Sequence, residues 1–479
     1  MKTKQALGLH PAGEGDFVFP TYGGMVRLSA TEDALTPFGG LVPWAAFVRR
    51  CGLLERLSAS CPVVRNSPNA APVYDVLQSY ALTVLCDGDR FAHVQRLRCD
   101  ATLADLFGVG SIVSDDTIRR LFAQIEETDG AAWVAAASAP LWGALPDPLI
   151  LDWDATVQTK HGHREGAAIG CNPHRPGRRS LHPLLAVAAG TRLCVAYRFR
   201  SGDTVSATQW DAAMEDAQRG LGTRRVWLNR GDLGFGHERI LAWHEAQPER
   251  PHYLFKLRLT ANVRRALAAL PESAWQGPAQ RGVLQVAELE LQLPGWSRSR
   301  RVVAGRRLLG VIPAEKAGAF WDRTRHEFEA YVTNLDVQQA SGWQIVELYR
   351  KRADTENVFD ELKHQWGFDG FCSRKKNLTA LAARLGLLVC NLWHLFLLLL
   401  EPGRHVESKG GRRWFLLIAG RLTQSGRQKQ FPIGVAGAWW QQLKAGYQRI
   451  CRWLEQTAPQ LKSSHARAPD FAFLKPTTG

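Results

Sequence analysis

The chain has 479 residues, of which 45% are hydrophobic and 22% are charged. This length predicts several domains of about 150 residues, and the composition excludes a collagen-like chain, a disordered tail and a small disulfide scaffold. Lys and Arg exceed Asp and Glu by 15, and the pI is about 9.6. A basic excess of this size favours a polyanionic partner, either nucleic acid or an acidic membrane surface.

The nine cysteines are odd in number and form no Cys-x-x-Cys pair, which argues against a secreted disulfide framework or a zinc ribbon and indicates a reducing cytoplasm. The N-terminus has no apolar core of a signal peptide. The stretch Leu378–Leu400 is long enough to span a bilayer, but it contains Arg384, Asn391 and His394, which are costly in lipid. We therefore expect a buried central helix and no membrane.

Residues 40–130 have the apolar spacing of helices. Ser114 can cap a helix that contains Arg119 and Arg120, and a short Gly-containing turn precedes it, as in a helix-turn-helix. This pattern predicts DNA contact by the two arginines. A capped surface helix is an equally good interpretation, since residues 1–150 carry 12 basic and 16 acidic side chains.

Beyond the turn at residues 146–148, apolar runs alternate with helical patterns and predict an α/β domain that opens with a strand meander. Strands are expected at 149–157, 184–189, 193–199, 225–229 and 252–259, and helices at 206–220 and 237–245. Residues 260–335 are strand-like with basic turns, and Trp343–Lys363 is predicted to be one long helix.

Acidic residues occur where a metal site could form. Asp152 and Asp154 share one face of an apolar strand, where an acid is costly unless it is paired or metal-bound. Asp232 follows the strand 225–229, where α/β proteins place functional groups. A salt-bridging acid in the first place and a plain Asp turn in the second are the structural alternatives.

The helix 343–363 carries a mixed polar stripe. At 100° per residue, Tyr349, Arg352, Glu356 and Lys363 fall within about 60° of one another, beside the apolar face. A solvated stripe with an Arg352–Glu356 ion pair is the simpler interpretation. Three acids from separate segments could instead hold two divalent metals about 4 Å apart for phosphoryl transfer, and hard oxygen ligands select magnesium or manganese.

These residues together resemble one family. Tyr349, Arg352, Glu356 and Lys363, separated by two, three and six residues, resemble the Tyr-Arg-Glu-Lys signature of a branch of bacterial insertion-sequence transposases of the DDE type. Residues 152–156 and 162–186 resemble the first-acid motif and the stretch after it. Residues 229–235 resemble the second-acid motif, with Leu233 where the family usually has Ser.

The resemblance implies an α/β fold: an RNase H-like mixed sheet with a β-rich insertion before the third acid, plus helical N-terminal and C-terminal regions. On this chain the expected parts are a DNA-binding region 1–145, core segments 146–259 and 336–403, the insertion 260–335, and a basic C-terminal region 404–479. The metal-binding catalytic triad would be Asp154, Asp232 and Glu356, with Asp152 as the runner-up for the first acid. Magnesium is the expected cofactor, and manganese should substitute for it.

The resemblance also implies DNA contacts. Tyr349, Arg352 and Lys363 would contact phosphates near the cut end, and Trp296 or Trp321 would stack a flipped base. A basic loop adds Arg175, Arg178 and Arg179, with a plain solvated turn as its alternative. Residues 401–479 contain 13 basic and 4 acidic residues, and the basic residues interleave with aromatic ones. This pattern suits either DNA contact or a packed helical tail. No phosphate-binding Gly loop is present, so no nucleotide cofactor is expected.

We therefore expect a bacterial, cytoplasmic and nucleoid-associated DNA transposase. It would bind the terminal inverted repeats of its element as a homodimer, cut them with a metal-dependent mechanism and join them to target DNA. The alternatives are a catalytically inactive DNA-binding relative and an RNase H-like structure-specific nuclease.

Overall fold

A computed structural model describes residues 17–312, 323–404 and 406–456. Its centre is one eight-stranded mixed sheet with the strand order β12-β13-β14-β11-β10-β4-β8-β9. The strands are β4 (Leu149–Ala155), β8 (Leu184–Ala188), β9 (Leu193–Arg198), β10 (Val226–Gly231), β11 (His252–Lys256), β12 (Leu284–Leu291), β13 (Arg300–Ile312) and β14 (Arg323–Thr333). The predicted meander is confirmed, because β4, β8 and β9 pair antiparallel in succession, whereas β4, β10 and β11 run parallel.

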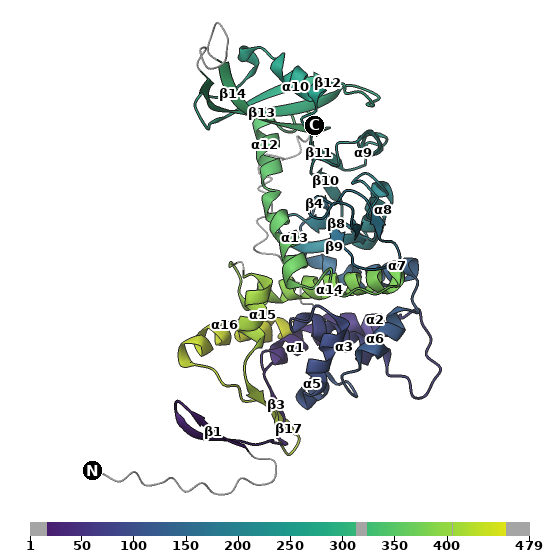
Figure 1. Ribbon diagram of the computed structural model, residues 1–479. Helices are drawn as coiled ribbons and strands as arrows, with labels where there is room; N and C mark the ends of the chain where they lie inside the picture. Colours follow the sequence, from purple (N-terminus) through teal and green to yellow (C-terminus); the bar gives the residue numbers. More distant parts are fainter. Residues whose placement is uncertain (1–16, 313–322, 405, 457–479) are drawn as a thin grey trace, which may run out of the picture.

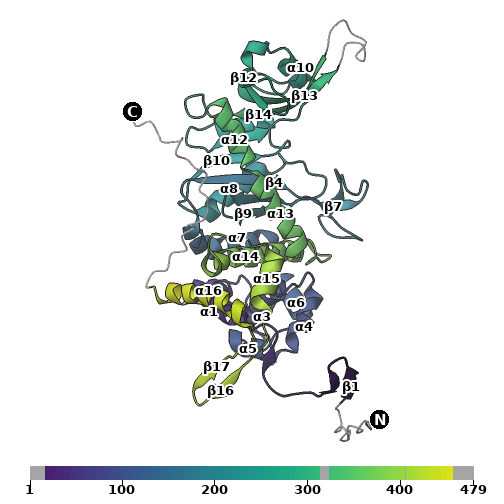
Figure 2. The ribbon, with the colours of Figure 1, turned by 90° about the vertical axis from the view of Figure 1, so that its left-hand side faces the viewer.

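Helices cover both faces of this sheet, and most side chains of its central strands are therefore buried. On one face α8 (Trp210–Leu221) and α9 (Glu238–Glu245) pack over Trp153 and Phe235. On the other, α12 (Gly342–Arg350) and α13 (Ala353–Gln365) run along the molecule in front of the sheet, as Figure 2 shows. Leu348 of α12 packs there with Ile150 and Leu228.

The prediction of one long helix over 343–363 is wrong in one respect. The chain leaves the α-helix at Lys351 and Arg352, between α12 and α13. The Arg352 amide donates to the Tyr349 carbonyl, and the Thr355 amide donates to the Arg352 carbonyl, both at 2.9 Å. These i to i+3 bonds tighten the turn, so the angular spacing of a continuous helix does not hold across it.

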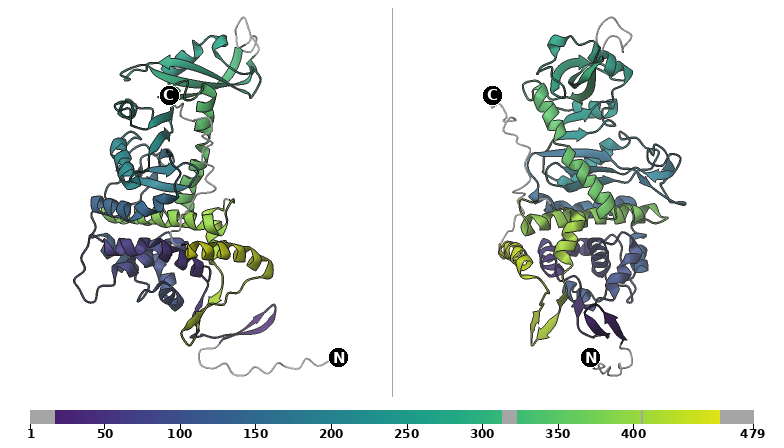
Figure 3. Two further views of the ribbon diagram at one scale, coloured as in Figure 1. Left: turned by 180° about the vertical axis from the view of Figure 1, so that it is seen from behind. Right: turned by 60° about the vertical axis from the view of Figure 1, so that its left-hand side comes forward.

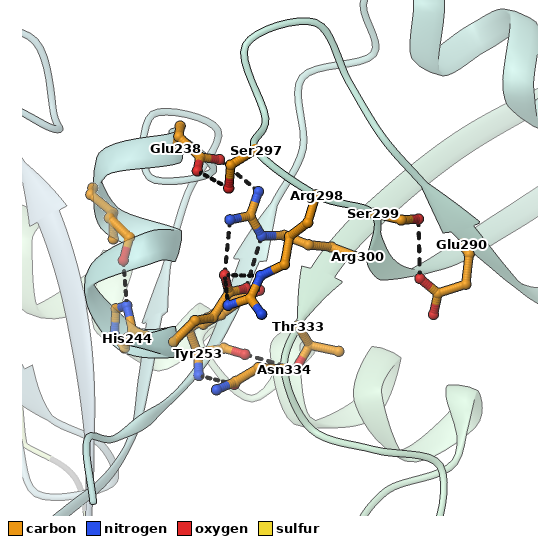
Figure 4. Close-up of polar contacts among 12 residues, drawn as sticks. Glu238, His244, Tyr253, Glu290, Ser297, Arg298, Ser299, Arg300, Thr333 and Asn334 are labelled. Carbon is orange, nitrogen blue, oxygen red and sulfur yellow. Dashed lines mark hydrogen bonds and ion pairs between the residues drawn. The ribbon is translucent and has the colours of Figure 1, made fainter. Parts of the chain in front are cut away.

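The expected β-rich insertion begins with a helix, α10 (Ala261–Ala268), before its three strands. These strands continue the core sheet, because β14 pairs with β11. A polar cluster fastens them to the core: Arg300 of β13 pairs with Glu238 and Glu245 of α9, with nitrogen–oxygen distances of 2.7 and 2.8 Å. Figure 4 shows Arg300 and Arg298 reaching toward this helix beside Tyr253.

A helical body lies below the sheet in Figure 1, and the apolar helix α14 (Lys376–Leu400) runs through its upper part. In the described part of the chain, α14 is the one helix long and apolar enough to cross a membrane, but 78% of its most apolar stretch is buried. Its Asn391 accepts from the Cys194 amide of β9 at 2.9 Å and donates to its carbonyl at 2.7 Å. The expected central buried helix is confirmed.

Helices from both ends of the sequence pack around α14, as Figures 1 and 3 show. Those in contact with it are α1 (Leu41–Cys51), α3 (Val73–Leu85), α6 (Asp115–Phe122), α7 (Glu127–Ser138) and α16 (Gly437–Glu455). The helical body also contains α2 (Leu53–Ala59), α4 (Gln95–Arg98), α5 (Ala101–Phe107) and α15 (Ser408–Leu416), with the 3-10 turns η1 (Phe91–Val94) and η2 (Ala139–Ala144). The expected cap is confirmed, since Ser114 Oγ accepts from the Thr117 amide at 3.3 Å.

The two regions expected to be helical also contain strands. In the described part of the N-terminal one, the first element is the hairpin of β1 (Phe17–Thr21) and β2 (Gly24–Leu28), which has Gly23 in the tight turn between its strands. Further along, β3 (Leu35–Thr36) pairs with β15 (Gly420–Arg421), and β16 (Thr423–Ser425) pairs with β17 (Gln428–Gln430). All nine cysteines are free.

Candidate active site

The first two candidate acids lie side by side at the carboxyl ends of adjacent parallel strands. The register pairs Asp152 with Arg230 and Trp153 with Gly231, so the next residues are Asp154, near the end of β4, and Asp232, directly after β10. Asp154 and Asp152 share one face of β4, as the alternation of a strand requires. Two carboxylates therefore meet at the centre of the sheet, where parallel strands end.

The turn after β10 fixes Asp232. The Gly234 amide donates to Asp232 Oδ1 at 3.0 Å, while Leu233 between them is exposed. Gly231 is needed just before it, because a Cβ there would lie 2.6 Å from the ring of Phe235. The turn holds the carboxylate without any contribution from the Leu233 side chain.

Asp152 has a different environment from Asp154. It is fully buried, and Arg230 forms a bidentate ion pair with it: Nε lies 2.6 Å from Oδ1 and Nη2 lies 2.7 Å from Oδ2. Thr355 Oγ1 of α13 donates to Asp152 Oδ2 at 2.6 Å. All of its charge is thus met by protein groups, whereas the Asp154 side chain is 23% exposed.

Arg352 joins the first acid to the third. Its Nη2 lies 3.1 Å from Asp154 Oδ2, and its Nη1 lies 3.6 Å from Glu356 Oε1. Nη2 also donates to the Trp153 carbonyl at 3.0 Å. The Arg352 side chain is 4% exposed, so in this structure it is a buried counter-charge to Asp154. Glu356, by contrast, is 71% exposed and faces solvent.

The electrostatics reflect this crowding of charges. Burial, together with the charge of Asp232, raises the pKa of Asp154 to about 6, although Arg352 acts against the shift. Burial also raises the pKa of Tyr349 to about 12, and Asp232, Glu356 and Asp154 add to the effect. Tyr349 is therefore protonated at neutral pH and can donate a hydrogen bond.

The three acids are not yet gathered as an assembled metal site. Within residues 17–312, 323–404 and 406–456, no three His, Cys, Asp or Glu side chains are placed so that they could hold a metal ion. The donor set nevertheless fits a hard divalent cation, since it consists of carboxylates alone. A cation beside Asp154 and Asp232 would also lower the raised pKa of Asp154.

The remaining cations expected to contact DNA differ in exposure. Arg175, Arg178 and Arg179 are exposed on the segment around β5 (Gln158–Thr159), β6 (Ala168–Ile169) and β7 (Arg179–Leu181), and Arg120 is exposed on α6. Arg119 is half-buried, with its guanidinium 5.1 Å from the centre of the Phe91 ring and a 3.6 Å ion pair to Asp115. Lys363 is half-buried on α13.

The expected base-stacking residue Trp296 is buried beneath Arg300, whose guanidinium lies 5.1 Å from the ring centre. It therefore presents no free face, and Trp321 lies outside the described residues. In the basic C-terminal region, Arg412 pairs with Asp87 at 2.6 Å and stacks on Trp366. Arg449 donates to the Leu399 and Leu400 carbonyls at the end of α14. These two arginines favour the packed tail.

Arg230 and Thr355 are missing from the candidate residues predicted from sequence. Each stands within two residues of an expected acid, Arg230 before Asp232 and Thr355 before Glu356. A charged residue inside the apolar run 226–231 was the available signal, because such a residue needs a buried partner.

Comparison with known proteins identifies the family. The family described as transposase DDE domain group 1 matches residues 20–453. None of the curated proteins compared with this chain matches it. Among solved structures, the cryo-EM structure of the piggyBac transposase synaptic complex with hairpin DNA is similar at 14% identity and a TM-score of 0.37, over 93% of this chain and 87% of that chain. Because the family match covers nearly the whole sequence, the chain belongs to the DDE-domain transposases, enzymes that transfer phosphoryl groups on DNA.

Proposed function

We propose that this protein binds the terminal inverted repeats of an insertion sequence, cuts the DNA strands there and joins the ends to target DNA. The observation that carries the proposal is the adjacency of Asp154 and Asp232 at the ends of β4 and β10, with Glu356 linked to Asp154 through Arg352. A pair of acids beside a solvent-exposed third one suits a centre that binds metal and DNA.

Asp154, Asp232 and Glu356 would hold magnesium, and manganese would replace it. The bound cations would polarise the scissile phosphate and favour ionisation of the attacking hydroxyl. Before DNA arrives, Arg352 balances the charge of Asp154 and Glu356. Tyr349, which retains its proton, would donate a hydrogen bond to a phosphate oxygen, and Lys363 would add a positive charge from α13.

We further propose that β9, β8, β4, β10 and β11 are the RNase H-like core. The antiparallel meander followed by two parallel strands, with the acids at the junction, supports this assignment. The exposed Arg175, Arg178 and Arg179 would bind the DNA backbone beside the centre. A homodimer would hold the two transposon ends together.

The test is strand cleavage on duplex DNA that carries the inverted repeats flanking the gene. We expect cuts at the repeat boundary with magnesium and none with chelator. Asp232→Asn and Glu356→Gln should abolish the cuts and leave repeat binding largely intact. Asp360→Asn, one turn beyond Glu356, is the matched control and should keep cleaving.

The alternatives give different products. An inactive DNA-binding relative would bind the repeats without cutting in magnesium or manganese. A structure-specific nuclease would cut without joining the ends to a target plasmid. Loss of binding together with cleavage in Glu356→Gln would contradict a purely catalytic role for that residue.

A further inference from the structure

A buried polar cluster lies beneath the three candidate metal ligands. It consists of Asp152, Arg230 and Thr355, which are 0%, 1% and 3% exposed. Arg230 holds Asp152 through two hydrogen bonds of 2.6 and 2.7 Å, and Thr355 Oγ1 donates to the same carboxylate at 2.6 Å. We call these three residues the Asp152 cluster.

Each member of the Asp152 cluster comes from a different one of the segments that carry the acids. Asp152 stands two residues before Asp154 on β4, and Arg230 stands two residues before Asp232, in β10. Thr355 directly precedes Glu356 in α13. One hydrogen-bonded unit therefore connects all three segments at a distance of one or two residues from the ligands.

The Asp152 cluster also reaches the break between α12 and α13. Arg230 Nη1 donates to the Leu348 carbonyl near the end of α12. The last carbonyls of a helix have no hydrogen-bond donor within the helix. Arg230 therefore supplies the donor for the Leu348 carbonyl. Arg230 thereby ties the second-acid strand to both helices, through Leu348 on one side and through Asp152 and Thr355 on the other.

From this geometry we infer that the Asp152 cluster positions Asp154, Asp232 and Glu356 relative to one another for divalent-cation binding. Its members are positioning residues, since none of them faces the reacting groups. The inference rests on the proposed function for the identity of the ligands. The residues that orient metal ligands commonly change metal affinity by 10-fold to 100-fold when they are removed.

The sharpest test is to remove the Thr355 hydroxyl, because Thr355→Val does so without changing the shape of the side chain. Thr355→Ser retains the hydroxyl and serves as the conservative rescue. Thr83→Val is the matched control, since Thr83 is a buried helical residue of α3 whose hydroxyl donates to the Ser79 carbonyl at 2.7 Å. The full-length proteins would be titrated with Mn²⁺, and the free ion measured by electron paramagnetic resonance.

We expect Thr355→Val to weaken Mn²⁺ binding by about 10-fold. Thr355→Ser should bind close to the wild-type affinity, and Thr83→Val should lose thermal stability without losing affinity. The same Mn²⁺ affinity in Thr355→Val as in wild type, with a similar loss of stability in both Val variants, would reduce the Asp152 cluster to a structural element and overturn the inference.

Amide hydrogen exchange over residues 353–359 separates this inference from the proposed function, because it reports the placement of α13 whether or not DNA is cut. Faster exchange there in Thr355→Val, restored in Thr355→Ser, supports the cluster even if the wild-type protein cuts no DNA, a result that would overturn only the proposed function. Unchanged exchange and unchanged Mn²⁺ affinity in a protein that cuts DNA would overturn only the cluster's positioning role.

Discussion

Arg352 places its Nη2 3.1 Å from Asp154 Oδ2, in a buried position at the turn between α12 and α13. The guanidinium therefore supplies the positive charge that Asp154 and its neighbour Asp232 need in the protein without DNA. Although burial acts against the charged form of Arg352, Asp154 and Asp152 raise its pKa.

Removing this guanidinium should make the fold depend on divalent cations. We expect Arg352→Gln to lower the free energy of unfolding in chelator by about 2–3 kcal/mol, because Asp154 loses a largely buried partner. Manganese should then raise the melting temperature of Arg352→Gln more than that of wild type. Arg350→Gln, which loses an ion pair to Glu329 away from the acids, is the control. An equal manganese response in all three proteins would contradict this role.

Substitutions of Asp152 and Asp154 should have different effects, one on the stability of the fold and the other on DNA cleavage. Asp154→Asn should abolish cleavage with little loss of stability, because burial and the charge of Asp232 already disfavour this carboxylate. Asp152→Asn should lower the free energy of unfolding by about 3 kcal/mol, since it leaves Arg230 buried and only partly paired. Urea unfolding and repeat cleavage measure the two effects. Cleavage that survives Asp154→Asn would exclude Asp154 as the first acid.

The free energy of unfolding should decrease at acidic pH because Glu238 becomes protonated. Hydrogen bonding to Arg300, partly opposed by burial, lowers the pKa of Glu238 to about 2. A lowered native pKa stabilises the fold above the unfolded pKa of about 4.5, and this contribution is lost as pH falls from there toward 2. The contribution of this lowered pKa to the free energy of unfolding is on the order of 3 kcal/mol. Unfolding measured at pH 6 and pH 3 should differ less in Glu238→Gln. The exposed Glu290→Gln, drawn in Figure 4, should keep the wild-type difference.

The exposed loop should contribute DNA affinity without sequence preference. Arg175→Gln and Arg178→Gln should each weaken binding of repeat and unrelated duplexes alike, and lower the slope of log affinity against log salt by about 1. Arg119→Gln should change the slope less, because Arg119 already pairs with Asp115 and stacks on Phe91. Fluorescence anisotropy across a salt series measures this. Equal slopes for Arg178→Gln and wild type would remove the loop from the interface.

In the basic C-terminal region, some cations should stabilise the fold by packing and others should not. Arg449→Gln should lower the free energy of unfolding by about 1–3 kcal/mol, because it leaves the Leu399 and Leu400 carbonyls at the end of α14 without their donor. Lys444→Gln, at an exposed position on the same helix, should leave stability unchanged. Thermal unfolding of the two variants decides between a packing role and a solely DNA-binding role for Arg449.

Much of the fold follows from local patterns in the sequence. The meander, the parallel strands and α14 are encoded by apolar runs whose period and length are specific, and the Ser114 cap by side-chain chemistry next to the helix. The break at Lys351 and Arg352 is not encoded in this way. Both residues favour helix, and the chain turns there because buried groups on β4 and β10 bind Arg352 and the Leu348 carbonyl.

For the candidate site, the sequence by itself determined which acids are available, their order and the family they indicate, because these depend on residue type and spacing. It could not separate Asp152 from Asp154, since alternation puts both on one face of the strand. Only the tertiary structure brings Arg230 and Thr355 to Asp152 and leaves Asp154 beside Asp232. The environment of a buried carboxylate depends on partners 78 and 203 residues away, and no local pattern specifies such contacts.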